Sequence, residues 1–186
     1  MTMKRLKGLG NNILTILQKN KWLVAVIILL LILLISFITR KNYYYGMLFY
    51  TDSSKTKLIA EKRAILREKN KIDRVGKIVE ELLLGPIDPS LVNIFPIDSK
   101  LISYSLENDT LLLNLDRQTF LSIDYEKENN NLLPYLQLQS IVISVCFNER
   151  SIKNVRFYFD GEEYRFIGNY GPITNGVKPD WKILKK

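Results

Sequence analysis

The stretch KIVEELLLGP, residues 77–86, reads as the last turns of an amphipathic helix that stops at a Gly-Pro pair. In and before this stretch the apolar residues recur at helical spacing, at Ile72, Val75, Val79, Leu82 and Leu83. The charged residues fall mostly on the other side, at Asp73, Arg74, Lys77, Glu80 and Glu81. Gly85 offers the backbone freedom of a helix C-terminus, and Pro86 cannot continue a helix. The pattern predicts a one-sided helix that packs on a sheet.

Strand patterns lie on both sides of this helix. YYYGMLFYT, residues 43–51, predicts a strand, although its three tyrosines suit a membrane interface equally well. KRAILRE, residues 62–68, fits either a strand or the start of a helix. Residues 101–116 predict two strands around a turn at 107–109, and VRFYFDGEEYRF, residues 155–166, predicts a hairpin at its Asp-Gly pair.

One segment gives conflicting signals. In NNNLLPYLQLQSIVISVCFNER, residues 129–150, Pro134 suits the first turn of a helix. The residues that such a helix would place on one face are Leu138, Ile141, Val142, Val145 and Cys146. The β-branched run IVISV favours a strand instead. The residues alone leave both readings open.

An uncharged apolar run, WLVAVIILLLILLISFIT, covers residues 22–39. At 18 residues it is near the lower length for crossing a hydrocarbon core of about 30 Å, so we expect an uncleaved transmembrane helix. A core helix would show a polar stripe, and a signal peptide would show small residues before its cleavage site; the run has neither. A lipid anchor would need a Cys just after the run, and the only Cys is Cys146.

Basic residues flank this run unevenly, with Lys4, Arg5, Lys7, Lys19 and Lys21 before it and Arg40 and Lys41 just after it. Because basic flanks tend to remain cytoplasmic, we expect a basic cytoplasmic tail at 1–21 and a transmembrane helix at 22–39. An extracytoplasmic domain at 44–167 and an irregular C-terminal tail at 168–186 would follow. The expected localisation is the cytoplasmic membrane, with a single pass and the N-terminus inside.

Composition excludes several kinds of chemistry. Of 27 Lys and Arg, seven lie in residues 1–41, which leaves 20 against 19 Asp and Glu in the rest and gives no basic footprint for nucleic acid. With no His and one Cys the chain has no His-based triad, no intramolecular disulfide and no ordinary zinc site. We expect Cys146 to be a small buried apolar residue.

Two groups of carboxylates are candidate sites, and we reject both. Glu80 and Glu81 are adjacent on a helix and do not face each other, which argues against an acid-base pair. Asp124, Glu126 and Glu128 lie in SIDYEKENNN, which lacks the Gly and the ligand spacing of a calcium loop. We therefore expect no catalytic, cofactor-binding or metal-binding residues, and no cofactor.

The order of these segments resembles the GerMN domain family, named for a protein of spore germination and sporulation. The resemblance rests on EELLLGP (80–86), IFPIDSKLISYSLENDTLLLNLDRQTF (94–120) and SIVISVCFNERSIKNVRFYFDG (140–161). MLFYTDSSKTKLIAEKRAIL (47–66) is similar to the opening strand of the family and its L-x-x-E-x-R segment. The resemblance spans about residues 44–167.

The resemblance implies an α+β fold and makes residues 134–148 a helix. It also implies membrane-tethered extracytoplasmic modules that act through protein contacts, without established catalytic residues. We therefore expect one transmembrane helix followed by a compact domain with two main helices packed on a β-sheet. The expected function is a non-enzymatic scaffold or adaptor in a bacterial cell-envelope complex, and the expected partners are the lipid bilayer, envelope proteins and a second copy of the chain. The alternative is a module that binds cell-wall glycan or a small envelope ligand through exposed aromatics such as Tyr164 and Tyr170.

Overall fold

The computed structural model describes residues 21–38, 42–121, 132–165, 173 and 175–185. The chain divides into two compact units, Met1–Lys41 and Asn42–Lys186. Most of the expected cytoplasmic tail, the carboxylate loop with Asp124, Glu126 and Glu128, and Tyr170 lie outside the described residues.

The first unit contains helix α2, Lys21–Ile38, where we expected a membrane span. That expectation is wrong: among the described residues no helix combines the length and the apolar character needed to cross a membrane. Helix α2 begins at the charged Lys21 and ends at Ile38, so it does not contain the whole of the uncharged run 22–39. The expected localisation as a single-pass protein of the cytoplasmic membrane is wrong for the same reason.

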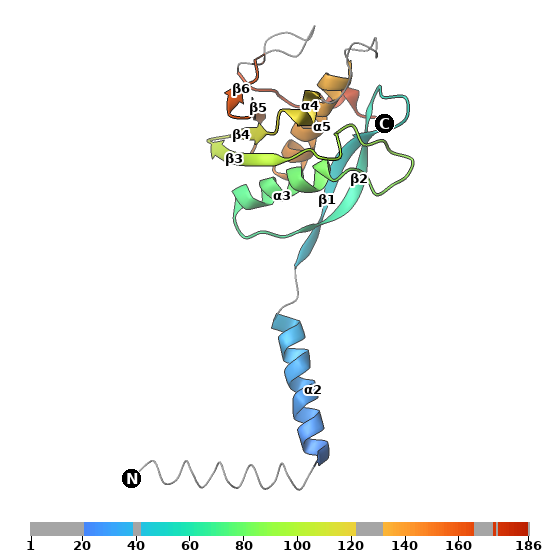
Figure 1. The fold of residues 1–186 in the computed structure, drawn as a ribbon, viewed down its shortest axis with the longest axis vertical. Helices are drawn as coiled ribbons and strands as arrows, with labels where there is room; N and C mark the ends of the chain where they lie inside the picture. Colours follow the sequence, from blue (N-terminus) through green and yellow to red (C-terminus); the bar gives the residue numbers. More distant parts are fainter. Residues whose placement is uncertain (1–20, 39–41, 122–131, 166–172, 174, 186) are drawn as a thin grey trace, which may run out of the picture. The chain divides into compact units, whose positions relative to one another are not determined.

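The second unit is a mixed α+β domain, as expected, but its strands form two sheets rather than one (Figure 1). The first is an antiparallel pair of β1, Tyr43–Thr51, and β2, Leu58–Leu66. The second has the order β3-β4-β5-β6 and contains β3, Leu101–Glu107, β4, Thr110–Leu115, β5, Asn154–Phe159, and β6, Glu162–Glu163. The strand predicted at 43–51 is confirmed, and the open question at 62–68 is answered by a strand.

Both predicted turns form, and each uses the left-handed backbone that tight turns require. Asn108 has a φ of 56° between the antiparallel strands β3 and β4. Asp160 and Gly161 have φ angles of 52° and 86° between β5 and β6. Positive φ at both central residues is the geometry of a two-residue hairpin turn, which explains the Asp-Gly pair.

Two main helices and a short one accompany the sheets in the described part of this domain. Helix α3 is Lys71–Leu83, helix α4 is Gln118–Leu121 and helix α5 is Leu132–Asn148. Helix α5 crosses between the parallel strands β4 and β5 and contacts both β1 and β5, so it lies between the two sheets (Figure 1). The core is formed by the inward faces of β1, β4 and β5 together with α3 and α5.

The edge of β1 opposite β2 is hydrogen-bonded by side chains of α5. Ser144 accepts from the Phe49 N–H at 3.1 Å, and Ser140 donates to the Phe49 carbonyl. Asn148 accepts from the Met47 N–H at 3.0 Å and donates to the Met47 carbonyl at 2.7 Å. Four residues of helix rise about 6 Å and two residues of strand about 6.7 Å, so polar side chains at every fourth helical position match the strand edge.

The polar side chains Ser140, Ser144 and Asn148, which we call the α5 stripe, explain why the segment with strand-like composition is a helix. Residues 136–146 of α5 are all buried, so the helix has no wet face and its apolar pattern resembles that of a buried strand. In the helix, the residues that lie on one face and form hydrogen bonds with the backbone groups at the β1 edge are Ser140, Ser144 and Asn148. The helix implied by the family resemblance is therefore confirmed.

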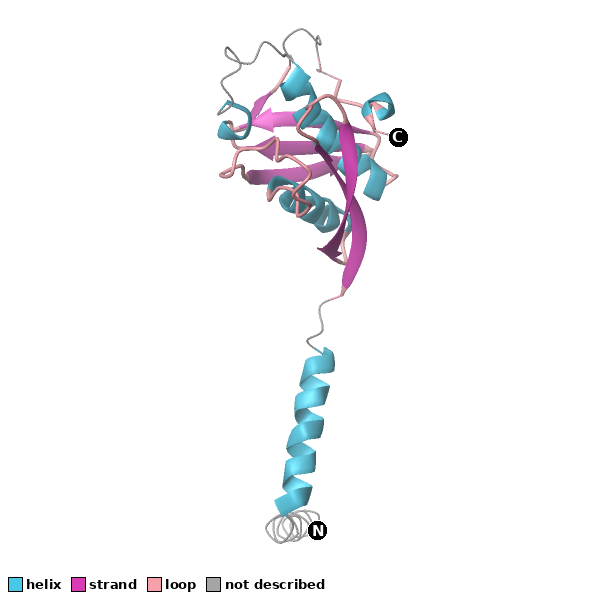
Figure 2. Ribbon diagram, turned by 90° about the vertical axis from the view of Figure 1, so that its right-hand side faces the viewer, coloured by secondary structure: helices cyan, strands magenta, loops and turns pink. Residues whose placement is uncertain are grey.

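The described residues 175–185 pack on the domain, and Figure 2 shows the C-terminus beside it. Val177 bridges to Val155 at the start of β5, and Leu184 bridges to Leu58 at the start of β2. Between them lies a 3-10 turn, η2, Trp181–Ile183. The described part of the expected irregular tail thus packs against both sheets.

We predict that Ser144→Ala lowers the free energy of unfolding by about 1–3 kcal/mol, because it leaves the buried Phe49 N–H without an acceptor. Ser105→Ala on the exposed part of β3 is the matched control and should change it by less than about 0.5 kcal/mol. Denaturant unfolding followed by circular dichroism measures both. Equal effects of the two substitutions would show that the α5 stripe does not stabilise the β1 edge.

Candidate functional site

The buried charges of the domain lie on strand β2. Glu61 and Arg63 occupy inward-facing positions, with side chains 9% and 5% exposed. Their nearest charged atoms, Arg63 Nη2 and Glu61 Oε1, are 2.7 Å apart. A buried ion pair is either a site or a structural element, and its other contacts decide between the two.

Arg63 binds the end of helix α3. Its Nη1 donates to the carbonyl oxygen of Glu81 at 2.8 Å, and its Nη2 donates to that of Gly85 at 2.7 Å. The hydroxyl of Tyr50, from β1, lies 3.1–3.3 Å from the carbonyl oxygens of Glu81, Leu82 and Gly85. Burial raises the pKa of Tyr50, so its hydroxyl remains a donor. A cation and a hydroxyl therefore cap the carbonyls at the end of the helix, of which that of Leu82 also accepts from the Gly85 N–H.

Glu61 holds the loop that follows. Its Oε2 accepts from the N–H groups of Ile87 and Asp88 at 2.8 and 2.9 Å. Gly85 turns the chain into this position with a φ of 87°, and an added Cβ there would lie 2.8 Å from Asn93. The pair uses its hydrogen bonds on the backbone of its own chain, so it is a structural cap and not an open site.

The carboxylates that we rejected as an acid-base pair have separate partners. Glu80 pairs with Lys77, and the Glu81 carboxylate lies 3.8 Å from Arg63 Nη1. Tyr164, one of the two aromatics suggested for glycan binding, is half-buried and packs edge-on against Phe159 with ring centroids 5.0 Å apart. Within the described ranges, no group of three or more His, Cys, Asp or Glu side chains is arranged so that it could hold a metal ion.

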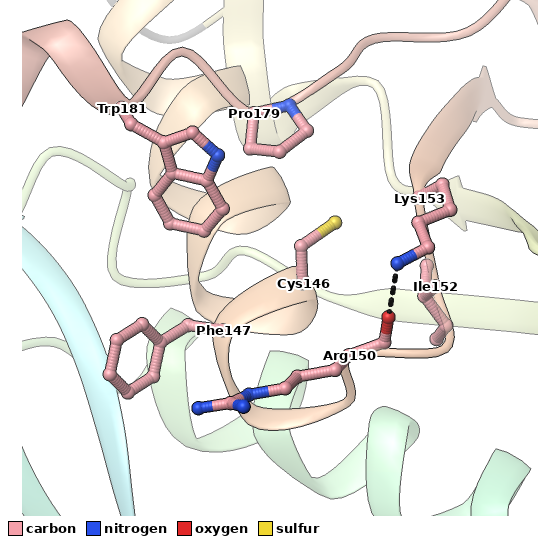
Figure 3. A pocket seen from close by; sticks show the side chains of 7 residues that line it. All are labelled: Cys146, Phe147, Arg150, Ile152, Lys153, Pro179 and Trp181. Carbon is pink, nitrogen blue, oxygen red and sulfur yellow. Dashed lines mark hydrogen bonds between the residues drawn. The ribbon is translucent and has the colours of Figure 1, made fainter.

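A pocket of about 330 Å³ lies at the C-terminal end of α5 (Figure 3). Its lining comes from α5, from the turn before β5 and from the C-terminal segment. The lining residues are Cys146, Phe147, Arg150, Ile152, Lys153, Pro179 and Trp181. Figure 3 shows Cys146 in the middle of this ring, with Phe147 and Trp181 on one side and Lys153 on the other.

Two exposed aromatic side chains form the apolar wall. Trp181 is 47% exposed and Phe147 is 46% exposed. Phe147 also packs against the buried Phe49 of β1, with ring centroids 5.4 Å apart at 65°. Ile152 and Cys146 supply a buried apolar floor.

The segment that carries Trp181 is fixed to helix α5. The Asp180 N–H donates to Gln139 at 2.9 Å, and Gln139 donates to the Lys178 carbonyl at 3.0 Å. Tyr135 donates its hydroxyl to the Asp180 carboxylate at 2.9 Å, and the same carboxylate accepts from the Lys182 N–H. The backbone that carries Trp181 is therefore fixed to α5 before any partner binds.

The charged lining residues are both basic. Lys153 Nζ donates to the Arg150 carbonyl at 2.8 Å, which holds the ammonium at the rim. The Arg150 guanidinium has no ion-pair partner within the described part of the chain. Burial raises the pKa of the Cys146 thiol to about 11, partly offset by the charge of Lys153, so the thiol is protonated at neutral pH. This agrees with the expected role of Cys146 as a small apolar residue.

A second cavity, of about 520 Å³, lies where β1, β2, α3 and α5 meet. It is lined by Asn42, Tyr44, Arg67, Glu68, Lys69, Arg74, Asn148 and Glu149. Arg74 and Glu149 pair across it at 2.7 Å. The buried hydroxyl of Tyr44 has no hydrogen-bond partner among the described residues.

A family model described as sporulation and spore germination, named Germane, matches residues 44–165. The chain belongs to the Germane family. This confirms the GerMN resemblance. The Germane match covers every element of the second unit from β1 to β6 but ends before the Trp181 segment, which supplies one wall of the pocket.

Solved structures of GerMN domains share the fold. The first GerMN domain of the sporulation protein GerM from Bacillus subtilis is 16% identical with a TM-score of 0.52, covering 73% of this chain and 97% of that one. The tandem GerMN domains of the same protein are 14% identical with a TM-score of 0.53, covering 74% of this chain and 46% of theirs. A putative lipoprotein from Clostridium perfringens is 20% identical with a TM-score of 0.48, covering 75% and 91%. No sequence of a curated protein matches the chain.

We predict that Cys146 in the native protein reacts slowly with a thiol reagent at pH 8 and that the rate rises as the pH approaches about 11. The reason is that only the thiolate reacts, and burial keeps the thiol protonated to a pH above its ordinary 9.0. Labelling in denaturant, where the thiol titrates normally, is the control. Native labelling as fast as denatured labelling at pH 8 would contradict the buried position.

Proposed function

We propose that this chain is a non-enzymatic adaptor that acts through protein contacts in a cell-envelope complex of sporulation or germination. Membership of the Germane family supports a role in sporulation or germination, and the fold is that of GerMN domains. The observation that carries the adaptor role is the pair of exposed aromatics, Phe147 and Trp181, held at a pocket by a hydrogen-bonded segment.

The physical argument is that exposed aromatic rings beside a pocket are typical of interface anchors. Tryptophan and arginine are enriched among the residues that contribute most to protein binding, and Trp181 and Arg150 line the same pocket. Fixing Trp181 through Asp180, Gln139 and Tyr135 removes ordering cost from the binding step. Such a surface suits stable recognition of another protein without any chemical step.

The exposed indole of Trp181 also supports a second candidate function, binding of cell-wall glycan. Sugar rings stack on aromatic faces, and Trp181 presents almost half of its surface. The two candidates differ in what the protein associates with, so one experiment separates them.

We predict that affinity purification of the full chain after chemical crosslinking in cells recovers a protein partner in fixed ratio, and that Trp181→Ala reduces this recovery at least tenfold. Trp22→Ala removes the other tryptophan of the chain, which lies in the first unit, and should leave recovery unchanged. Circular dichroism confirms that both variants fold.

Co-sedimentation of the chain with purified wall material, lost in Trp181→Ala, would establish the glycan candidate in place of the adaptor. A partner recovered equally with Trp181→Ala would contradict a role for this pocket. Absence of any protein in fixed ratio would contradict the adaptor function itself.

A further inference from the structure

We propose that the Phe147–Trp181 pocket binds an acidic peptide segment of its partner, in which an apolar side chain enters the pocket and neighbouring acidic groups bind Arg150 and Lys153 on either side of it. This inference rests on the adaptor function and specifies the chemistry of the partner. It follows from the charges around the pocket, from the geometry of its two cations and from the apolar floor between them.

The charges around the pocket are one-sided. Arg150 and Lys153 line it, and no acidic residue does. The nearest acidic residues in the sequence do not pair with these cations: Glu149 pairs with Arg74 at 2.7 Å, and the Asp180 carboxylate accepts from the Tyr135 hydroxyl and the Lys182 backbone N–H. Among the described residues, no ion pair neutralises the two cations that line the pocket.

The two cations lie on opposite sides of the pocket, so each can bind an acidic group of the same peptide (Figure 3). Lys153 Nζ spends one donor on the Arg150 carbonyl, which leaves two of its three donors. The guanidinium of Arg150 lies on the Phe147 side and offers a planar fork that matches the two oxygens of a carboxylate. A peptide with a carboxylate at Arg150 and a second acidic group at Lys153 would neutralise both charges.

The floor of the pocket requires an apolar group next to that carboxylate. Ile152 and Cys146 are 1% and 6% exposed, and the thiol is protonated, so neither offers a charge to a ligand. Phe147 and Trp181 stand above this floor as exposed rings. A volume of about 330 Å³ suits one or two side chains rather than a large ligand.

Nucleic acid would also pair aromatics with cations, but it needs a groove of many cations along a backbone. Here two cations line the pocket, and residues 42–186 carry 20 Lys and Arg against 19 Asp and Glu. A short acidic peptide matches this limited charge.

The test is selection of peptides from a random phage-displayed library on the immobilised full chain, with a parallel selection on Arg150→Glu. We expect enriched sequences that place Asp or Glu beside Leu, Ile, Phe or Met, and no such enrichment on Arg150→Glu. The affinity of a synthesised winner is then measured by the fluorescence of Trp181 in a Trp22→Phe background, where Trp181 is the single tryptophan.

Arg150→Glu and Lys153→Glu should each weaken this peptide at least tenfold, and raised salt should weaken it as well. Lys100→Glu makes the same change of charge and is the matched control. Lys100 precedes Leu101, which pairs with Leu115 at one end of the second sheet. Asn154, next to Lys153, lies at the opposite end of that sheet, so Lys100 is remote from the pocket. Lys100→Glu should alter affinity by less than twofold.

Three results would overturn the acidic-peptide inference: no enrichment, enrichment of neutral or basic peptides, or affinities equal in Arg150→Glu and Lys100→Glu. Failure of this inference differs from failure of the adaptor function. If Trp181→Ala loses the cellular partner while Arg150→Glu retains it, the adaptor stands and the acidic partner is excluded. If both variants retain the partner, the pocket is not its docking site.

Discussion

The buried guanidinium of Arg63 is the point at which three elements of the domain meet. Tyr50 from β1, the pair Glu61 and Arg63 from β2, and the last carbonyls of α3 are joined there by hydrogen bonds of 2.7–3.3 Å. Glu61 then fixes the next two residues of the loop. A buried pair of this kind adds little stability compared with apolar residues, but losing one partner strands the other charge. It therefore specifies where the helix ends rather than strengthening the core.

This cap explains why two separate sequence features belong together. L-x-x-E-x-R corresponds to Leu58, Glu61 and Arg63, and EELLLGP supplies the carbonyls that Arg63 binds. The two residues that follow this motif supply the N–H groups that Glu61 binds. The helix, its end and the β1 strand follow from periodicity and turn residues. The Glu61–Arg63 cap could not be predicted in this way. A strand is recognised by apolar residues on its inward face, and this strand carries two charged residues there. The E-x-R spacing within a strand was the available signal.

Other features of the domain could not be predicted from the sequence, for different reasons. Helix α5 is buried on all sides, so its sequence lacks the stripe that marks a surface helix, and its polar stripe is recognisable only against β1. The pocket joins Phe147 to Trp181 across 33 intervening positions. The Trp181 segment has an irregular sequence pattern because side chains of α5, and not a regular strand ladder, hold it. The 22–39 run satisfied a composition rule, whereas the helix that forms there begins at Lys21 and ends at Ile38.

The most direct test of the central claim, that the Glu61–Arg63 pair fixes the end of α3, is a double-mutant cycle of unfolding free energies. Arg63→Met should cost about 3–5 kcal/mol, because it leaves Glu61 charged and buried. Adding Glu61→Gln, which is neutral and still accepts from Ile87 and Asp88, should restore at least about 1.5 kcal/mol of this loss, a coupling within the range for residues in one network. Additive effects, or an Arg63→Met variant that folds with normal stability but loses function in cells, would contradict the claim.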